Sequence, residues 1–177
     1  MVRFFAGAAL VILSSATSGT LAQDLPSGWR LPTRDELSDK LRAKSPTRFA
    51  KASADFNGDG VVDHAFLLRS TRFNGEGLWV QLSDGQHGYA WIRLDVMDWG
   101  PEEASGDSAM AIDVVAPGIH PYACFEHAPD CNFGPYHERP RLKLRDPSLL
   151  YFKLESASTS FFWSNKSRRF LRVWLSD

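Results

Sequence analysis

A nine-residue stretch from Asp55 to Asp63, Asp-Phe-Asn-Gly-Asp-Gly-Val-Val-Asp, has the spacing of a metal-binding loop. Oxygen-bearing side chains recur at alternate positions, and two glycines between them permit the positive φ angles of a tight loop. A hard cation such as Ca²⁺ takes about six to eight oxygen ligands. The stretch therefore predicts a calcium loop, or alternatively a solvated turn without an ion. The predicted ligands are the side chains of Asp55, Asn57, Asp59 and Asp63 and the backbone carbonyl of Val61.

The residues after the loop distinguish it from an EF-hand. Counted from Asp55, position 12 of the loop is Phe66, whereas an EF-hand has a bidentate Glu there. Residues 64–69 read as an apolar strand instead of an exit helix. A loop that closes at Asp63 and leads into a strand resembles the calcium loop of FG-GAP/VCBS-type repeats, over residues 54–68 of one unit. The resemblance implies Ca²⁺ ligation. It does not imply a propeller, because the sequence has no second Asp-x-Asn-x-Asp-Gly pattern.

The first 22 residues have the pattern of a signal peptide. Arg3 is positively charged, residues 4–13 are apolar, and Thr20-Leu21-Ala22 is a small-x-small cleavage site. The apolar stretch is too short to span a membrane, and no later segment approaches the length that a transmembrane helix needs. We therefore predict a periplasmic or secreted protein without a transmembrane segment. Its mature chain, residues 23–177, has the length of a single calcium-binding β domain.

The charges of the chain are nearly balanced, with 20 basic and 21 acidic residues. A nucleic-acid partner would require a basic excess, so none is expected. The C-terminal third is locally basic, and we interpret its cations as a solvated face in preference to an anion-binding patch. These cations are Arg139, Arg141, Lys143, Arg145, Lys166, Arg168, Arg169 and Arg172.

Hydrophobic patterning predicts a mainly β fold, an antiparallel sandwich or incomplete barrel with one short N-terminal helix. Thr33 and Glu36 form a capping-box pattern, which predicts a helix over residues 34–43. From Phe49 onward, short apolar runs alternate with turn residues. The predicted strands are residues 65–69, 77–83, 89–95, 109–115, 140–145, 149–155, 159–164 and 169–175.

Two cysteines, Cys124 and Cys131, lie in a loop rich in Pro, His and Asp. In an oxidising compartment such a pair predicts a disulfide, which would pin a local hairpin. The alternative is a tetrahedral zinc site formed with His127 and His137, although the spacing matches none of the familiar zinc motifs.

Catalytic motifs are lacking in the sequence, which has no Gly-x-Ser-x-Gly, His-Glu-x-x-His, Ser-x-x-Lys or phosphate-binding glycine loop. We therefore expect a non-enzymatic binding domain in which Ca²⁺ is structural. One alternative is an exported hydrolase with an unrecognised His/Asp/Glu site, because five histidines are scattered along the chain. The other is a structural or envelope-associated protein with no discrete ligand site.

The segments 151–158, 161–163 and 170–177 resemble the tail of small exported bacterial proteins of unassigned function that carry one such loop. A β-rich exported domain with one structural calcium is also similar to periplasmic inhibitors and immunity proteins that block cell-wall hydrolases. This similarity implies a protein partner in the cell envelope. The predicted binding loops are residues 98–108 and 117–138.

Overall fold

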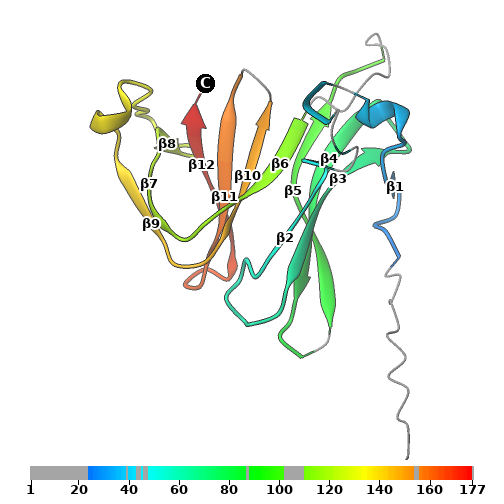
Figure 1. The fold of residues 1–177 in the computed structure, drawn as a ribbon, viewed down its shortest axis with the longest axis horizontal. Helices are drawn as coiled ribbons and strands as arrows, with labels where there is room; N and C mark the ends of the chain where they lie inside the picture. The colour runs from blue at the N-terminus through cyan, green and yellow to red at the C-terminus, as the bar shows by residue number, and fades with distance from the viewer. Residues whose placement is uncertain are drawn as a thin grey trace, which may run out of the picture.

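The computed structural model describes residues 24–38, 40–42, 45, 48–86, 88–101, 110–153 and 156–176. The predicted signal peptide, residues 1–22, lies outside them, as do residues 102–108 of the first predicted binding loop. The described chain folds into antiparallel β-sheets with three short 3₁₀ turns (Figure 1). Its elements are β1 (Trp29–Arg30), η1 (Asp35–Leu37), η2 (Lys40–Arg42), β2 (Lys51–Ala54), β3 (Asp63–Ser70), β4 (Gly75–Ser83), β5 (Tyr89–Asp98), β6 (Met110–Val115), β7 (Gly118–Pro121), β8 (Cys124–Phe125), η3 (Tyr136–Glu138), β9 (Arg141–Leu144), β10 (Ser148–Lys153), β11 (Ser158–Ser164) and β12 (Arg169–Ser176).

The predicted mainly β, antiparallel fold is confirmed. Each of the eight predicted strand runs coincides with a strand, namely β3 to β6 and β9 to β12. The strands that the sequence did not indicate are β1, β2, β7 and β8, which have only two to four residues each. Such short strands leave few residues for a period-two pattern, and β9 is the one strand of four residues that the pattern did predict.

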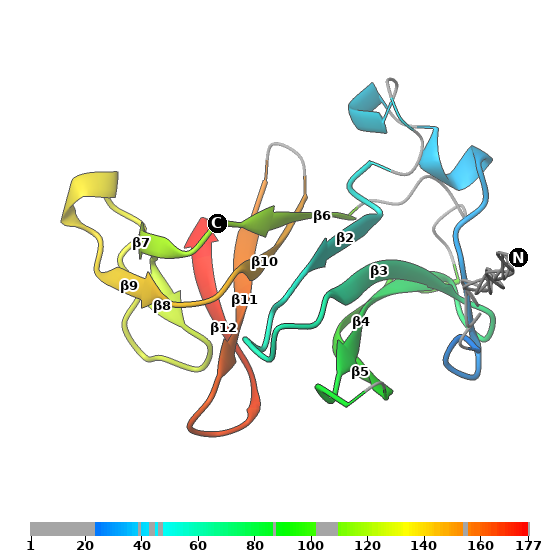
Figure 2. The ribbon, with the colours of Figure 1, turned by 60° about the horizontal axis from the view of Figure 1, so that its bottom comes forward.

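Two five-stranded antiparallel sheets face each other (Figure 2). The first sheet has the order β1-β3-β4-β5, with β2 also paired to β3, and the second has the order β6-β10-β11-β12-β8. A third, two-stranded sheet pairs β7 with β9. The core lies between the large sheets, where Leu67 and Leu78 of the first meet Leu149 and Phe161 of the second, all fully or almost fully buried.

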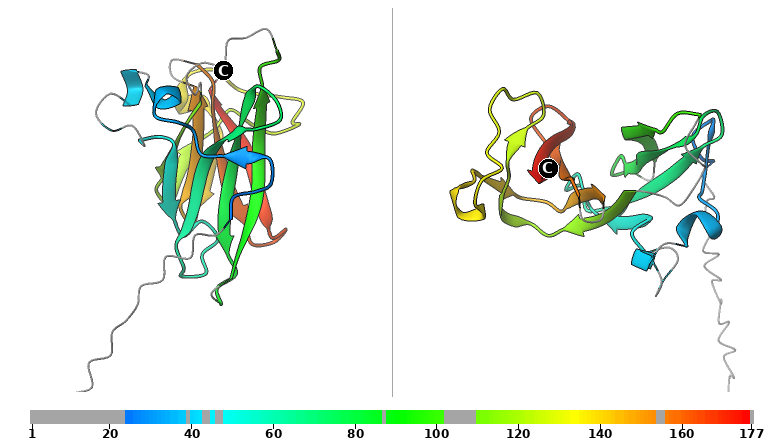
Figure 3. Two further views of the ribbon diagram at one scale, coloured as in Figure 1. Left: turned by 90° about the vertical axis from the view of Figure 1, so that its right-hand side faces the viewer. Right: turned by 90° about the horizontal axis from the view of Figure 1, so that it is seen from above.

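The two large sheets approach each other differently at their two sides (Figure 3). On one side β2 lies beside β6, and the nearby Ile112 N–H donates a hydrogen bond of 2.8 Å to the Phe49 carbonyl. On the other side β5 and β12 are bridged by side chains, with Arg172 Nη1 3.0 Å from Asp95 Oδ2. The sheets are therefore joined by backbone contacts at one side and by an ion pair at the other.

The predicted helix over residues 34–43 is not shown, because η1 and η2 are separate 3₁₀ turns. Its capping box does form. The Thr33 N–H donates to Glu36 Oε2 at 2.7 Å, and the Glu36 N–H donates to Thr33 Oγ1 at 3.3 Å. The Glu36 carboxylate also accepts two hydrogen bonds of 2.7 Å from the Arg30 guanidinium, which draws the turn toward β1.

Arg42 supplies the second reason for the missing helix. Its side chain is only 2 % exposed and donates hydrogen bonds to the carbonyls of Arg48, at 3.1 Å, and Met110, at 2.7 Å. Helices this short are marginal by themselves, so tertiary contacts of this kind decide the local conformation. Among the described residues no helix is long and apolar enough to cross a membrane.

Candidate functional site

The predicted calcium loop joins β2 to β3, which are paired with each other in the first sheet. Gly58 and Gly60 have φ angles of 73° and 88°, in the left-handed region that favours glycine. A Cβ at Gly58 would lie only 3.0 Å from Oδ1 of Asp146, which belongs to the turn between β9 and β10. The positive φ angle therefore favours glycine at position 58, and a Cβ there would require the Asp146 side chain to shift.

Asp55 organises the first half of the loop. One of its carboxylate oxygens, Oδ1, accepts hydrogen bonds from the backbone N–H groups of Gly58 and Asp59, at 2.7 and 3.1 Å. The other, Oδ2, accepts one from the Gly60 N–H at 2.8 Å. The backbone of the loop therefore wraps around this carboxylate.

Asp59 connects the loop to the end of β4. Its carboxylate accepts hydrogen bonds from the Val61 N–H at 2.8 Å, the Asn57 side-chain amide at 2.9 Å and the Ser83 hydroxyl. Burial opposes ionisation of this carboxyl, but the hydrogen bonds from Ser83, Val61 and Asn57 outweigh it and lower the pKa of Asp59. The Asn57 amide also donates to the Ser83 carbonyl at 3.0 Å.

Asp63 is fully buried at the start of β3. Its Oδ2 accepts a hydrogen bond of 2.8 Å from the Phe56 N–H, and its Oδ1 accepts one of 2.7 Å from the Ser83 N–H. Burial raises the pKa of Asp63 despite these two donors, and the negative charges of Asp59 and Asp55 raise it further. The structure thus brings the three predicted acidic ligands into one electrostatically coupled group.

The chemistry of this group suits a hard cation, because every predicted ligand is an oxygen. In the described part of the chain, none of the three carboxylates forms a salt bridge that would balance its charge. Their side chains are directed to N–H and O–H donors, however. No group of three or more His, Cys, Asp or Glu side chains among the described residues lies close enough together to hold a metal ion. A cation would therefore have to replace some of these hydrogen bonds.

The sequence did not identify the partners that other elements contribute to the loop. Ser83 follows Asp63 by 20 residues, and Asp146 lies in the turn between β9 and β10, before the second large sheet is entered at β10. The only signal near Ser83 is the Asp84-Gly85 turn, which indicates a chain reversal but not its proximity to the loop. Only the pairing of β3 with β4 brings Ser83 to this position.

The predicted disulfide between Cys124 and Cys131 is confirmed. It closes the loop that follows β8, a strand paired with β12 at the edge of the second sheet. The zinc alternative requires two thiolates, and the disulfide leaves neither available. The side chains of His127 and His137 are 91 % and 78 % exposed, so they do not form the two remaining corners of an enclosed site.

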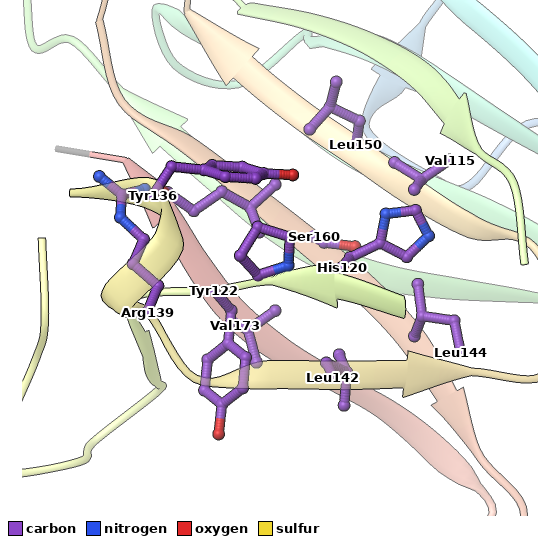
Figure 4. Close-up of a pocket in the computed structure, with 12 residues that line it drawn as sticks. Val115, His120, Tyr122, Tyr136, Arg139, Leu142, Leu144, Leu150, Ser160 and Val173 are labelled. Carbon is purple, nitrogen blue, oxygen red and sulfur yellow. The ribbon is translucent and has the colours of Figure 1, made fainter. Parts of the chain in front are cut away.

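A cavity of about 250 Å³ lies between the β7–β9 ribbon and the outer face of the second sheet (Figure 4). Aliphatic side chains from both layers form half of its lining, six of twelve residues. Tyr136, from η3, extends across it, as Figure 4 shows, and is 66 % exposed. The aliphatic residues are Val115, Leu142, Leu144, Leu150, Val173 and Leu175.

Most polar groups at this cavity already have partners within the protein. His120 Nε2 is 2.9 Å from the Ala116 carbonyl, and the Ser160 hydroxyl is 2.9 Å from that of Ser148. The Arg139 guanidinium donates to the carbonyls of Gly134, Phe133 and Leu175 at 2.8, 3.0 and 2.5 Å. The cavity therefore offers mainly apolar contact to whatever enters it.

One serine and one histidine lie within hydrogen-bonding distance on the first sheet. Ser53 Oγ is 2.8 Å from His64 Nδ1, across the β2–β3 pair. Burial lowers the pKa of His64, and the positive charge of Lys51 lowers it further. In the described structure no carboxylate orients this imidazole, and neither residue lines the cavity beside the β7–β9 ribbon. The pair therefore lacks the third member of a nucleophilic triad.

The fold and site define a small, disulfide-containing, antiparallel β domain with an acidic loop between two strands of one sheet. Comparisons with protein-family models, curated proteins and solved structures find no match.

Proposed function

We propose that this protein is an exported, non-enzymatic binding domain that recognises a protein partner in the cell envelope. The observation that carries the proposal is the distribution of exposed apolar side chains. Of six large hydrophobic residues that are exposed in the described structure, four lie in segment 117–138. These four are Ile119, Phe125, Phe133 and Tyr136. Exposed apolar and aromatic groups gathered on one segment are typical of an interaction surface.

The same segment is held in place by several contacts, which supports a preorganised binding surface. The Cys124–Cys131 disulfide closes its middle part, and the Asn132 N–H donates to the Ala123 carbonyl at 3.0 Å. Arg139, just beyond the segment, donates hydrogen bonds to the carbonyls of both Phe133 and Gly134. A surface that is already ordered loses less conformational entropy when it binds.

Calcium has a structural role in this proposal. Ca²⁺ bound at Asp55, Asn57, Asp59, Asp63 and the Val61 carbonyl would neutralise the mutually repelling carboxylates. The resemblance to FG-GAP/VCBS-type loops and the predicted export both support this assignment. Inhibition of a cell-envelope enzyme, or immunity toward one, is the most specific form of the proposed role. Its basis is the similarity of architecture to periplasmic inhibitors and immunity proteins.

Paired variants of the exposed hydrophobic residues test the proposal. Immobilised protein with the disulfide intact should capture one discrete envelope protein, and Phe133→Ser/Tyr136→Ser should abolish this capture. The matched control is Leu31→Ser/Val62→Ser, which removes the two remaining exposed hydrophobic side chains from other parts of the surface. Equal capture by both double variants, or no discrete partner for the wild type, would contradict the proposed surface.

The second candidate function is an exported hydrolase. Its one supporting observation is the contact between Ser53 and His64. An activity screen on cell-wall, ester and phosphoester substrates tests it. An activity that His64→Ala removes, while the fold remains intact, would favour the hydrolase over the binding domain.

A further inference from the structure

A second cavity, of about 240 Å³, lies at the side of the molecule where side chains bridge β5 and β12. Its lining includes the apolar side chains of Leu94 and Phe170. Four arginines also line it, and the single acidic residue among its lining residues is Glu126. The arginines are Arg93 from the first sheet and Arg168, Arg169 and Arg172 from the β11–β12 hairpin.

Only one of these four guanidinium groups is neutralised within the described structure. Arg172 pairs with Asp95 at 3.0 Å and also with Glu126. Arg93, Arg168 and Arg169 form no salt bridge with any described residue. Arg168 and Arg169 are exposed, and the Arg93 guanidinium lies 5.9 Å from the centre of the Trp79 ring, a contact that does not neutralise its charge. Arg168 also lines a neighbouring cavity together with Asp59 and Asp84. An anion in the arginine-lined cavity would interact favourably with the positive charges around it.

The backbone at Arg168 provides independent support for a binding role. This residue has a φ angle of 49°, in the left-handed region that a turn of this kind usually fills with Gly or Asn. Its N–H donates a hydrogen bond of 2.7 Å to the Ser164 carbonyl, which closes the hairpin. Strained non-glycine residues of this kind cluster at functional sites. Glycine would fit this turn with less strain but would provide no guanidinium group.

We infer that this cavity binds the carboxylate or phosphate group of an anionic ligand. Arginine suits both groups, because its planar guanidinium donates two parallel hydrogen bonds to an oxyanion. Leu94 and Phe170 would contact the uncharged body of the ligand. Arg168 and Arg169 are exposed, as expected of a solvated face, whereas Arg172 is half-buried and pairs with Asp95 and Glu126. All three arginines line one cavity with Arg93.

This inference does not depend on the proposed protein-binding surface, because the cavity contains none of the four exposed hydrophobic residues of that surface. Segment 117–138 contributes only Glu126 to the cavity, and Glu126 is not among the four exposed hydrophobic residues of that surface. Loss of envelope-protein capture and loss of anion binding would consequently be separate experimental results.

Calorimetric titration of the folded, disulfide-bonded protein tests the inference. The probes are inorganic phosphate and glucuronate, which carries a carboxylate on a ring, with glucose as the neutral control. Either anion should bind at a single site, and glucose should not bind. The anion that binds more tightly identifies the group that the cavity prefers.

Two variants locate this binding. Arg93→Gln and Arg169→Gln, which lie on different sheets, should each weaken it by about tenfold or more, as expected for loss of one charge-assisted hydrogen bond. Arg141→Gln, which removes an exposed cation on β9, should leave affinity unchanged within about twofold. Melting temperatures of the variants establish that each is folded. The inference is overturned if neither anion saturates a site, or if Arg141→Gln weakens binding as much as Arg93→Gln.

Discussion

The buried Asp63 carboxylate accepts a hydrogen bond of 2.7 Å from the backbone N–H of Ser83, 20 residues further along the chain. Its other oxygen accepts a hydrogen bond from the Phe56 N–H. The Asp63 side chain therefore joins the acidic loop to the end of β4. A buried carboxylate requires such partners, because an unsatisfied buried charge is strongly unfavourable. The conformation of the loop and the packing of the first sheet are therefore coupled, and a ligand that binds the loop should affect the stability of the whole domain.

Calcium should raise the melting temperature of the wild-type protein. A ligand that binds only the native state stabilises by about 2.7 kcal/mol at a hundredfold excess over Kd. For a domain of this size this corresponds to an increase of about 5–10 °C. Asp59→Ala should abolish the increase, because it removes a predicted ligand that contacts the loop and β4. Thermal melting in Ca²⁺ and in chelator measures both effects.

Asp84→Asn is the control for this experiment. Asp84 lies beside the loop, and its carboxylate accepts hydrogen bonds from the N–H groups of Gln86 and Gly88, which lower its pKa. It is not part of the predicted ligand set, so the variant should keep the calcium-dependent increase. An identical melting temperature of the wild type with and without Ca²⁺ would exclude the calcium site.

Phe56 should contribute strongly to stability although it lies in the loop. Its side chain is fully buried in the common core, whereas Val62, in the same loop, is 50 % exposed. Phe56→Ala should lower the free energy of unfolding by about 3–5 kcal/mol, because it leaves a cavity in the core. Val62→Ala should change it by less than about 0.5 kcal/mol. Denaturant titration of both variants measures the difference, and similar losses would show that Phe56 does not anchor the loop.

Local sequence patterns were sufficient to predict the longer strands and the disulfide. Alternation of the kind seen in Phe170 to Leu175 has period two, so it specifies which residues of β12 share a face. Cys124 and Cys131 are close in sequence, so their pairing required no knowledge of the remaining topology. The strand alternation and the disulfide can both be predicted because each involves residues that are close together in the sequence.

The features that the sequence did not predict depend on contacts between distant segments. The segment after Thr33 has a capping box, but Arg42 reaches the Met110 carbonyl, 68 residues away, and the predicted helix is replaced by 3₁₀ turns. The arginine cavity similarly combines Arg93 with residues of the β11–β12 hairpin. No spacing rule relates such positions, because their proximity results from the packing of the two sheets.

Removal of the disulfide should loosen segment 117–138 more than the remaining fold. The Cys124→Ser/Cys131→Ser variant should lose about 2–2.5 kcal/mol of unfolding free energy, the chain-entropy value for so short a loop. Limited proteolysis should then cleave first within the segment, while β10, β11 and β12 remain protected. Unchanged proteolysis together with unchanged stability would show that the contacts of Arg139 hold the segment without the disulfide.

The Glu36–Arg30 pair should make stability depend on pH below about 4.5. Hydrogen bonds from Arg30 lower the pKa of Glu36 from 4.5 to about 2, against an opposing effect of burial and with further help from the Thr33 N–H. Between these pH values the unfolded state binds more protons than the folded state. The contribution of Glu36 is therefore complete above about pH 4.5 and disappears as the pH falls toward 2.

Comparison of the wild type with Glu36→Gln isolates this contribution. The variant should be less stable by about 1–2 kcal/mol at pH 7, a value reduced from the full pKa shift because Arg30 is partly exposed and solvent screens the pair. At pH 2.5 most of the difference should be gone, because much of the favourable ionisation of Glu36 is lost by then. Glu138→Gln is the matched control, since the Glu138 side chain is 59 % exposed and should change stability little at either pH. Denaturant titrations at the two pH values measure these differences. If Glu36→Gln lowered the free energy of unfolding equally at both pH values, Glu36 would stabilise η1 by packing and not by its charge.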